Sequence, residues 1–258
     1  MFHGATLRGQ CRKLHVRLVV ATFFVGWSGV APARAGETGS AELPRLLTRD
    51  DRATLRDELA AHVVEIHRLI PPPKGMVAPI PDVRSGQGLC VAPGRILTAR
   101  ALVADWPLPN RAAEDHITVQ VVGGVPSTAS VEWQDTALGL AILNVKDAKG
   151  VPLESARCKP FGSPPTAWDT GNGLVLYTAY LGDSTLREVA TRGQGPDFRA
   201  WFVMADGDVV PLGTPLFSSR GRFVSVVGEL DTETPGRSFL VPSAALAAML
   251  AERSLWVP

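Results

Sequence analysis

A succession of short apolar runs, separated by glycine, proline and aspartate, is the feature that most limits what this chain can fold into. Ten such runs lie between residues 88 and 241, rich in Val, Ile, Leu and aromatic residues, with no helical pattern between them. Many short strands at this spacing are typical of an all-β barrel or sandwich. The expected strands are Gly88–Ala92, Ile96–Thr98, Ile117–Val122, Ala129–Trp133, Leu140–Val145, Gly173–Tyr180, Arg199–Met204, Pro215–Phe217, Phe223–Glu229 and Ser238–Val241.

Helical signals occur on either side of this region. Thr48 is a good N-cap with acidic residues on the turn that follows, which predicts a short helix over about 49–60. The period then changes, and Val63–Ile66 reads as a further strand. Near the end of the sequence, Pro242 and Ser243 open a segment rich in Ala, Leu and Met, which predicts a second helix over Ala244–Glu252.

The first 35 residues have the pattern of a signal peptide. Four basic side chains precede an apolar run, Leu18–Val30, and Ala33 and Ala35 supply the small residues that a signal peptidase reads. We therefore expect cleavage after Ala35 and a periplasmic or secreted protein without a membrane span in its mature form. Retention of residues 1–35 as an uncleaved anchor is the alternative.

The charge of the mature chain argues against some partners. Residues 1–35 hold five of the 26 basic residues and none of the 25 acidic ones, so 21 basic side chains remain and the net charge is −4. A mildly acidic domain without basic runs does not favour nucleic acid as a partner.

Two cysteines remain in the mature sequence, Cys90 and Cys158. In an exported protein such a pair can form a disulfide, and two separate buried thiols are the equal alternative. Two cysteines without clustered histidines do not have the spacing of a metal site, so we expect no metal and no cofactor.

Three blocks of sequence together resemble the HtrA/Deg branch of the trypsin-like serine proteases. Residues 85–103 (SGQGLCV, then GRILTARALV) are similar to the block around the family's catalytic His. Residues 135–145 (DTALGLAILNV) are similar to the block that holds its Asp. Residues 211–228 (PLGTPLF, then GRFVSVVG) are similar to the block that holds its Ser, and 238–243 (SFLVPS) to the family's closing segment. Each block is weak alone, but their order and spacing are fairly specific.

The resemblance covers roughly residues 60–253 and implies an all-β fold of two packed six-stranded antiparallel β-barrels. We expect a linker and short helix over 36–60, one barrel over 61–158, the second over 159–241, and a helix and tail over 242–258. The family's usual C-terminal peptide-binding (PDZ) domain has no counterpart in this arrangement.

The resemblance also shows that all three catalytic positions are replaced. The position of the His holds Ala101, that of the Asp holds Gly139, and that of the Ser holds Leu212. A methyl group, a hydrogen and an isobutyl group supply neither a nucleophile nor a base, so the triad chemistry of the family is absent.

The loop that forms the oxyanion hole in the family departs from the pattern as well. Its two backbone donors would belong to Val210 and Leu212, with Pro211 between them. Proline fixes φ, and valine resists the left-handed backbone that glycine permits. We therefore expect this loop to be degenerate and peptidase activity to be lost.

No other reactive residue restores the missing chemistry in the sequence. His62, His67 and His116 all lie outside the block that holds Ala101, and each reads as an ordinary core or solvated residue. An endopeptidase using non-standard residues, such as Thr214 or Ser218 with His116, is the alternative hypothesis.

The leading hypothesis is an exported pseudoprotease that acts as a binding, regulatory or scaffold module for a peptide or protein. Peptide capture in this fold rests on backbone hydrogen bonds along a strand edge, which does not need the triad. The resemblance assigns that edge to Val226, Val227, Gly228 and Glu229.

Overall fold

The computed structural model describes residues 47–70, 82–103, 116–121, 124–145, 158–163, 165, 175–180, 185–194, 200–204, 210–230 and 237–255. They all belong to the compact unit that spans Glu42–Pro258. The predicted signal peptide lies outside the described residues, as does the linker as far as residue 46.

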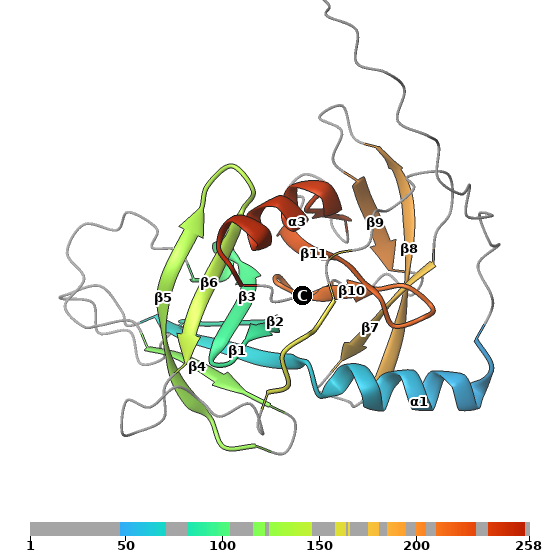
Figure 1. Ribbon diagram of the computed structural model, residues 1–258, viewed down its shortest axis with the longest axis horizontal. Helices are drawn as coiled ribbons and strands as arrows, with labels where there is room; N and C mark the ends of the chain where they lie inside the picture. Colours follow the sequence, from blue (N-terminus) through green and yellow to red (C-terminus); the bar gives the residue numbers. More distant parts are fainter. Residues whose placement is uncertain are drawn as a thin grey trace, which may run out of the picture. The chain divides into compact units, whose positions relative to one another are not determined.

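Twelve strands among the described residues form two closed six-stranded barrels, which confirms the all-β fold predicted from the sequence. The order of strands in the first barrel is β1-β2-β3-β6-β5-β4, and in the second it is β10-β11-β12-β9-β8-β7 (Figure 1). The strands of the first barrel are β1 (Val63–Ile70), β2 (Asp82–Ala92), β3 (Arg95–Ala99), β4 (His116–Gln120), β5 (Ser127–Asp135) and β6 (Leu140–Val145). Those of the second are β7 (Val175–Tyr180), β8 (Thr185–Gln194), β9 (Ala200–Met204), β10 (Pro215–Phe217), β11 (Phe223–Leu230) and β12 (Arg237–Leu240).

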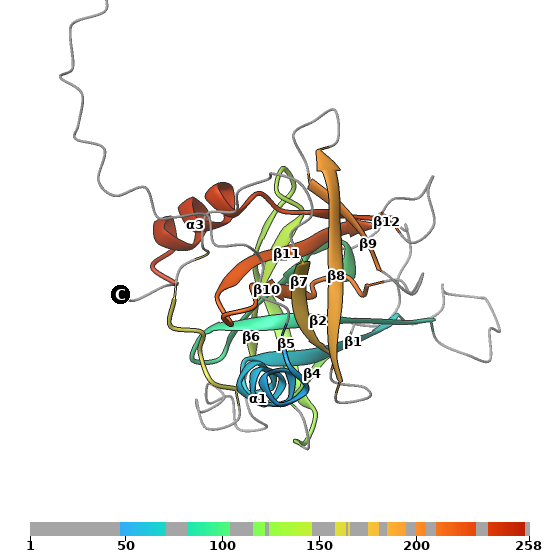
Figure 2. The ribbon, with the colours of Figure 1, turned by 90° about the vertical axis from the view of Figure 1, so that its right-hand side faces the viewer.

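Three helices accompany the barrels in the described part of the chain: α1 (Arg49–Ala60), α2 (Arg100–Val103) and α3 (Ser243–Glu252). Thr48 caps α1, because its hydroxyl accepts from the N–H of Asp51 and the Asp51 carboxylate accepts from the N–H of Thr48. α1 contacts β7 and β8, which Figure 2 shows side by side. The predicted first helix is confirmed, and α3 begins one residue earlier than predicted.

Apolar side chains from both barrels meet in one shared core. Residues of β1, β2, β3 and β6 pack there with residues of β7, β10 and β11 and with both terminal helices. Two further clusters fill the interiors, one for each barrel. Because the shared core includes Tyr177, Phe217 and Phe223, each at most 1% exposed, truncating one of these rings is expected to cost about 3–5 kcal/mol.

Several strands differ from the prediction by one or two residues at their ends, and four segments differ more. β8 was not predicted, because Thr185–Gln194 has no apolar run. β2 begins six residues before the predicted Gly88, and β1 continues four residues beyond the predicted Ile66. The helix α2 is a single turn, too short to show a period in the sequence.

Candidate functional site

The position predicted for the catalytic base, Ala101, lies on α2. β3 ends at Ala99, and the chain then turns because Leu102 and Val103 are buried in the core of the first barrel. Ala101 itself is exposed, and its carbonyl oxygen accepts a hydrogen bond of 3.2 Å from Nη1 of Arg84 on β2. The side chain offered at this place is a methyl group, which cannot take up a proton.

Gly139 ends the turn between β5 and β6. The turn is built by Asp135, whose Oδ1 accepts from the N–H of Ala137 at 2.7 Å and from that of Leu138 at 2.9 Å. The carboxylate of Asp135 is thus occupied in the turn. Gly139 has a φ of +67°, a left-handed backbone conformation that costs energy for residues other than glycine.

Leu212 stands in a tight turn that leads into β10. Its carbonyl oxygen accepts from the N–H of Gln87 at 2.9 Å, and its half-buried side chain packs against the core of the first barrel. The following residue, Gly213, has a φ of +77°, and a Cβ there would collide with the carbonyl oxygen of Gln87 and the hydroxyl of Thr98. The turn thus brings the backbone of one barrel directly onto the other.

The loop before Leu212 contains the two residues that the sequence assigned to a degenerate oxyanion hole, Val210 and Pro211. Val210 is 2% exposed and belongs to the core of the second barrel. Ser254 is the only described residue other than glycine with a positive φ, so Val210 lies outside the left-handed region. Pro211 has no N–H, and its carbonyl oxygen accepts from the N–H of Thr214 at 3.3 Å.

The structure places the neighbours of these three positions against one another. The N–H of Arg100, next to Ala101, donates to the carbonyl oxygen of Gly139 at 2.7 Å. Leu102 and Leu212 approach the same point on β2, because a Cβ built on Gly86 would lie 2.7 Å from Cδ2 of Leu102 and 2.5 Å from the carbonyl oxygen of Leu212. No side chain at the three positions themselves carries a reactive group.

The predicted peptide-binding edge is only partly open. Both backbone polar groups of Val227 are hydrogen-bonded: its N–H donates to the carbonyl oxygen of Thr214 at 3.0 Å, and its carbonyl oxygen accepts from the N–H of Gly213 at 2.8 Å. The carbonyl oxygen of Val226 accepts from Val241 at 3.1 Å, and both valines are fully buried. These groups are therefore closed to a peptide, because the turn before β10 bonds to Val227 and Val241, which follows β12, bonds to Val226.

The remaining two residues of that edge lie beside the turn that holds Gly139. A Cβ on Gly228 would lie 3.5 Å from the carbonyl oxygen of Leu138, and one on Gly139 would lie 3.7 Å from the carbonyl oxygen of Gly228. Glu229 is exposed. Gly228 is buried, and Glu229 pairs with Phe239 of β12, with a shift of register between Val227 and Glu229.

The hydroxyl groups of the alternative nucleophiles take part in other hydrogen bonds. Thr214 is fully buried, and its hydroxyl donates to Oε1 of Gln87 at 3.0 Å. The hydroxyl of Ser218 accepts from the N–H groups of Arg220 and Arg222 in a turn of the second barrel. His116 is exposed on β4 of the first barrel, and no described interaction links it to either hydroxyl.

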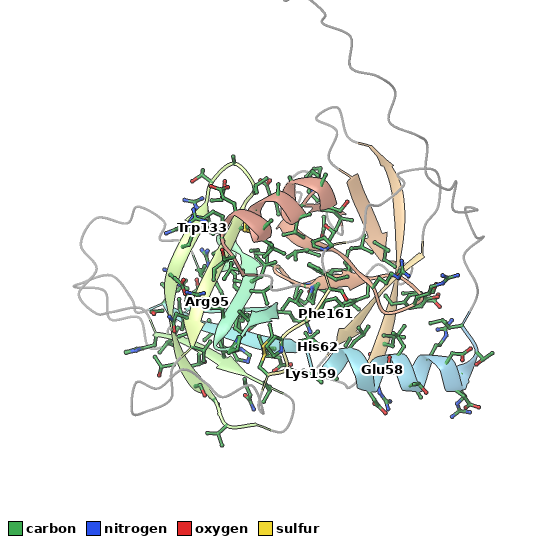
Figure 3. The ribbon with its side chains drawn as sticks, in the orientation of Figure 1. Glu58, His62, Arg95, Trp133, Lys159 and Phe161 are labelled. Atoms are coloured by element: carbon green, nitrogen blue, oxygen red, sulfur yellow. A yellow bond between two sulfur atoms is a disulfide. The ribbon has the colours of Figure 1, made fainter. Side chains whose placement is uncertain are left out.

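The two other histidines of the described region make local contacts. Nδ1 of His62 lies 2.7 Å from the carbonyl oxygen of Lys159, and its ring meets the ring of Phe161 edge-on at 5.1 Å (Figure 3). Burial lowers the pKa of His62, and the hydrogen bond to Lys159 offsets this only in part. Nδ1 of His67 lies 2.9 Å from the hydroxyl of Ser85, across the β1–β2 ladder.

The sulfur atoms of Cys90 and Cys158 are bonded in the structure, across a sequence separation of 68 residues. The disulfide fastens the segment that leads toward the second barrel to β2. Next to it, the N–H of Lys159 donates to Ala61 at 3.0 Å and that of Phe161 to Cys90 at 2.8 Å.

Within the described parts of the chain, no group of three or more His, Cys, Asp or Glu side chains could hold a metal ion. No helix in those parts has both the length and the apolar character needed to cross a bilayer.

Solved structures with the same fold are serine proteases. The Rv3671c protease from M. tuberculosis in its active form is 22% identical, covers 76% of this chain and 82% of its own, and superposes with a TM-score of 0.53. Its inactive form gives 20% identity, 78% and 92% coverage, and a TM-score of 0.51. The serine endoprotease from Yersinia pestis is 18% identical, with 83% and 68% coverage and a TM-score of 0.50.

These likenesses show that the chain has the trypsin-like serine protease fold. No protein-family model and no curated protein matches the sequence.

Proposed function

We propose that this chain is an exported pseudoprotease that binds an extended peptide or protein segment and does not cleave it. The observation that carries the proposal is Leu212 at the head of the turn that precedes β10. In this sharp turn Gly213 has a φ of +77°, and the carbonyl oxygen of Leu212 accepts from the N–H of Gln87. The side chain of Leu212 is an isobutyl group. Restoring a reactive group there would still leave Ala101 and Gly139 without a base or a carboxylate.

The backbone around the site supports the same proposal. Gly139 is left-handed and Val210 is a buried core residue, so the departures extend beyond the three side chains. Loss of the nucleophile alone costs a triad enzyme on the order of a millionfold in rate. Loss of one oxyanion donor costs about a hundredfold to a thousandfold. Both losses together leave no useful rate.

Binding does not require any of these groups. β11 bulges at Gly228, where its register with β12 shifts, and we expect an extended segment to pair with the backbone at this bulge. The disulfide between Cys90 and Cys158 supports the export that the N-terminal residues predict, because such bonds persist in oxidising compartments.

A two-part experiment on the purified protein tests the proposal. A broad serine-directed phosphonate and a library of fluorogenic peptides should give no labelling and no hydrolysis above buffer. A library of extended peptides should give saturable binding that slows amide hydrogen exchange at Gly228 and Glu229. Stoichiometric labelling of one hydroxyl would overturn the first half, and the absence of binding at millimolar peptide would overturn the second.

A further inference from the structure

Two hydroxyl groups inside the second barrel have no hydrogen-bond partner among the described residues. They belong to Thr178 on β7, which is 1% exposed, and to Ser238 on β12, which is fully buried. A buried hydroxyl without a partner costs free energy, because it has given up its hydrogen bonds to solvent. Native proteins pair nearly all such groups, either with protein atoms or with ordered water.

Both side chains point into the barrel. Successive side chains of a strand alternate between its two faces, so Thr178 shares a face with Leu176. Ser238 shares a face with Leu240 for the same reason. Both leucines belong to the apolar cluster that fills the interior of the second barrel. Tyr177, next to Thr178, packs on the outer face, in the core that the two barrels share.

The two hydroxyls lie on the same side of this cluster. In the ring β10-β11-β12-β9-β8-β7, β7 and β12 are three strands apart in either direction, so they stand opposite one another. Every pairing in the ring is antiparallel, and β7 and β12 therefore run in opposite directions. The step from Leu176 on to Thr178 and the step from Leu240 back to Ser238 thus lead the same way along the barrel. The hydroxyls face one another across the interior, one layer beyond the leucines.

The described surroundings of the two hydroxyls supply no partner. The members of the cluster are leucine and valine side chains, which neither donate nor accept hydrogen bonds. The two hydroxyls do not bond to each other, because their short side chains project from opposite sides of the ring. Ser225 shows the usual solution for a buried hydroxyl of this barrel, since it donates to the carbonyl oxygen of Val241 at 2.5 Å.

We propose that the interior of the second barrel binds ordered water between Thr178 and Ser238. A hydroxyl both donates and accepts, and a water molecule does the same in return. Buried water molecules typically make about three hydrogen bonds to groups that would otherwise be unsatisfied. The bound water would link β7 to β12, two strands that no ladder joins directly. The inference is independent of the proposed function, because it concerns the interior of one barrel.

Replacing one hydroxyl by a methyl group distinguishes a hydrated pair from a dry one. If water is bound, Thr178→Val loses the bonds that this water makes, and the equilibrium constant for unfolding should rise about tenfold. A value equal to or below that of the unaltered protein would show that the hydroxyl had no partner to lose, and would overturn the inference. Thr128→Val, at an exposed position of β5, is the matched control and should change the constant by no more than about twofold.

A double-mutant cycle tests whether the two hydroxyls hold the same water. Ser238→Ala alone should also raise the equilibrium constant for unfolding. Once either hydroxyl is gone the water is lost, so the second replacement removes a group that is already unpaired. The double variant should therefore be no less stable than either single variant. Effects that simply add would mean that the two sites are independent, and would refute a shared water.

The water itself can be counted in the full protein. Magnetic relaxation dispersion of oxygen-17 in the solvent reports water molecules that stay buried for longer than the protein takes to tumble. The number of such molecules should fall in the double variant and should be unchanged in Thr128→Val. An unchanged number in a folded double variant would overturn the inference, whatever the stability of the single variants.

Discussion

The hydroxyl of Thr214 donates a buried hydrogen bond of 3.0 Å to the side-chain amide of Gln87, and this bond joins the two barrels. The same amide donates from Nε2 to the carbonyl oxygen of Ala179 on β7 at 3.3 Å. β10 pairs with β7 only at Phe217 and Tyr177, so the side chain of Gln87 stands where a further rung of the ladder would be. A residue of the first barrel thus helps to close the second.

Replacing this amide should weaken the whole molecule. Gln87→Met keeps the length of the side chain but leaves the Thr214 hydroxyl and the Ala179 carbonyl buried without a partner. We expect the free energy of unfolding to fall by about 2–4 kcal/mol, since each unsatisfied buried group costs about 1–3 kcal/mol. Urea unfolding followed by circular dichroism measures this. Gln134→Met, on the exposed face of β5, is the control and should change stability by less than about 0.5 kcal/mol.

The turn at Gly213 should tolerate no side chain. Gly213→Ala combines a φ of +77° with a Cβ that meets Gln87 and Thr98, so we expect a loss of about 3 kcal/mol or more. Gly162→Ala is the matched control, because a Cβ there has no atom within 4 Å, and its effect should stay within about 0.5 kcal/mol. Similar melting temperatures for the two variants would show that the turn is not packed as described.

Acid should destabilise the fold in part through His62. Burial holds its pKa below the ordinary 6.5, so the folded protein binds its proton later than the unfolded chain as the pH falls. This contribution to stability is fully present above pH 6.5 and is lost as the pH drops from there through the lowered pKa. Urea unfolding at several pH values should show a smaller loss in acid for His62→Gln than for the unaltered protein.

The barrels could be predicted because apolar runs survive wherever a strand is buried on both faces. Leu140–Val145 is such a strand, and the sequence located it to the residue. β8 shows the opposite case, since Thr185–Gln194 interleaves polar and charged residues and leaves no run to detect. The early part of β2 was missed for the same reason, because Val83 is the only large apolar residue between Asp82 and Gln87.

The features of the candidate site also divide into those that the sequence indicates and those that only the fold creates. Ala101, Gly139 and Leu212 were singled out by the resemblance to the HtrA/Deg motifs, which lie along the sequence. The left-handed φ of Gly139, the burial of Val210 and the closure of Val227 by the turn before β10 were not, since each depends on contacts between residues far apart in sequence. Gln87 could not be singled out, because its amide gains importance only where two barrels meet around it.

Restoring the triad side chains alone should not produce a protease. In the triple variant Ala101→His, Gly139→Asp and Leu212→Ser, the backbone of the new residue at position 139 must adopt a φ near +67°. This conformation costs a residue other than glycine about 1 kcal/mol. The loop before position 212 still has the buried side chain of Val210 and a proline at 211, so we expect one oxyanion donor to stay misplaced. We expect hydrolysis of fluorogenic peptides no faster than for the unaltered protein.

Two further substitutions test the contribution of the loop to activity apart from that of the triad side chains. Adding Val210→Gly and Pro211→Asn to the triple variant gives the loop a glycine that can adopt a positive φ and removes the proline. Recovery of one oxyanion donor is worth about a hundredfold to a thousandfold in rate. Activity should therefore appear in the five-residue variant and not in the triple one. Thermal unfolding of both checks that they are folded. If the triple variant alone cleaved peptides well, the loop would already be competent, and only the missing side chains would separate this chain from an active enzyme.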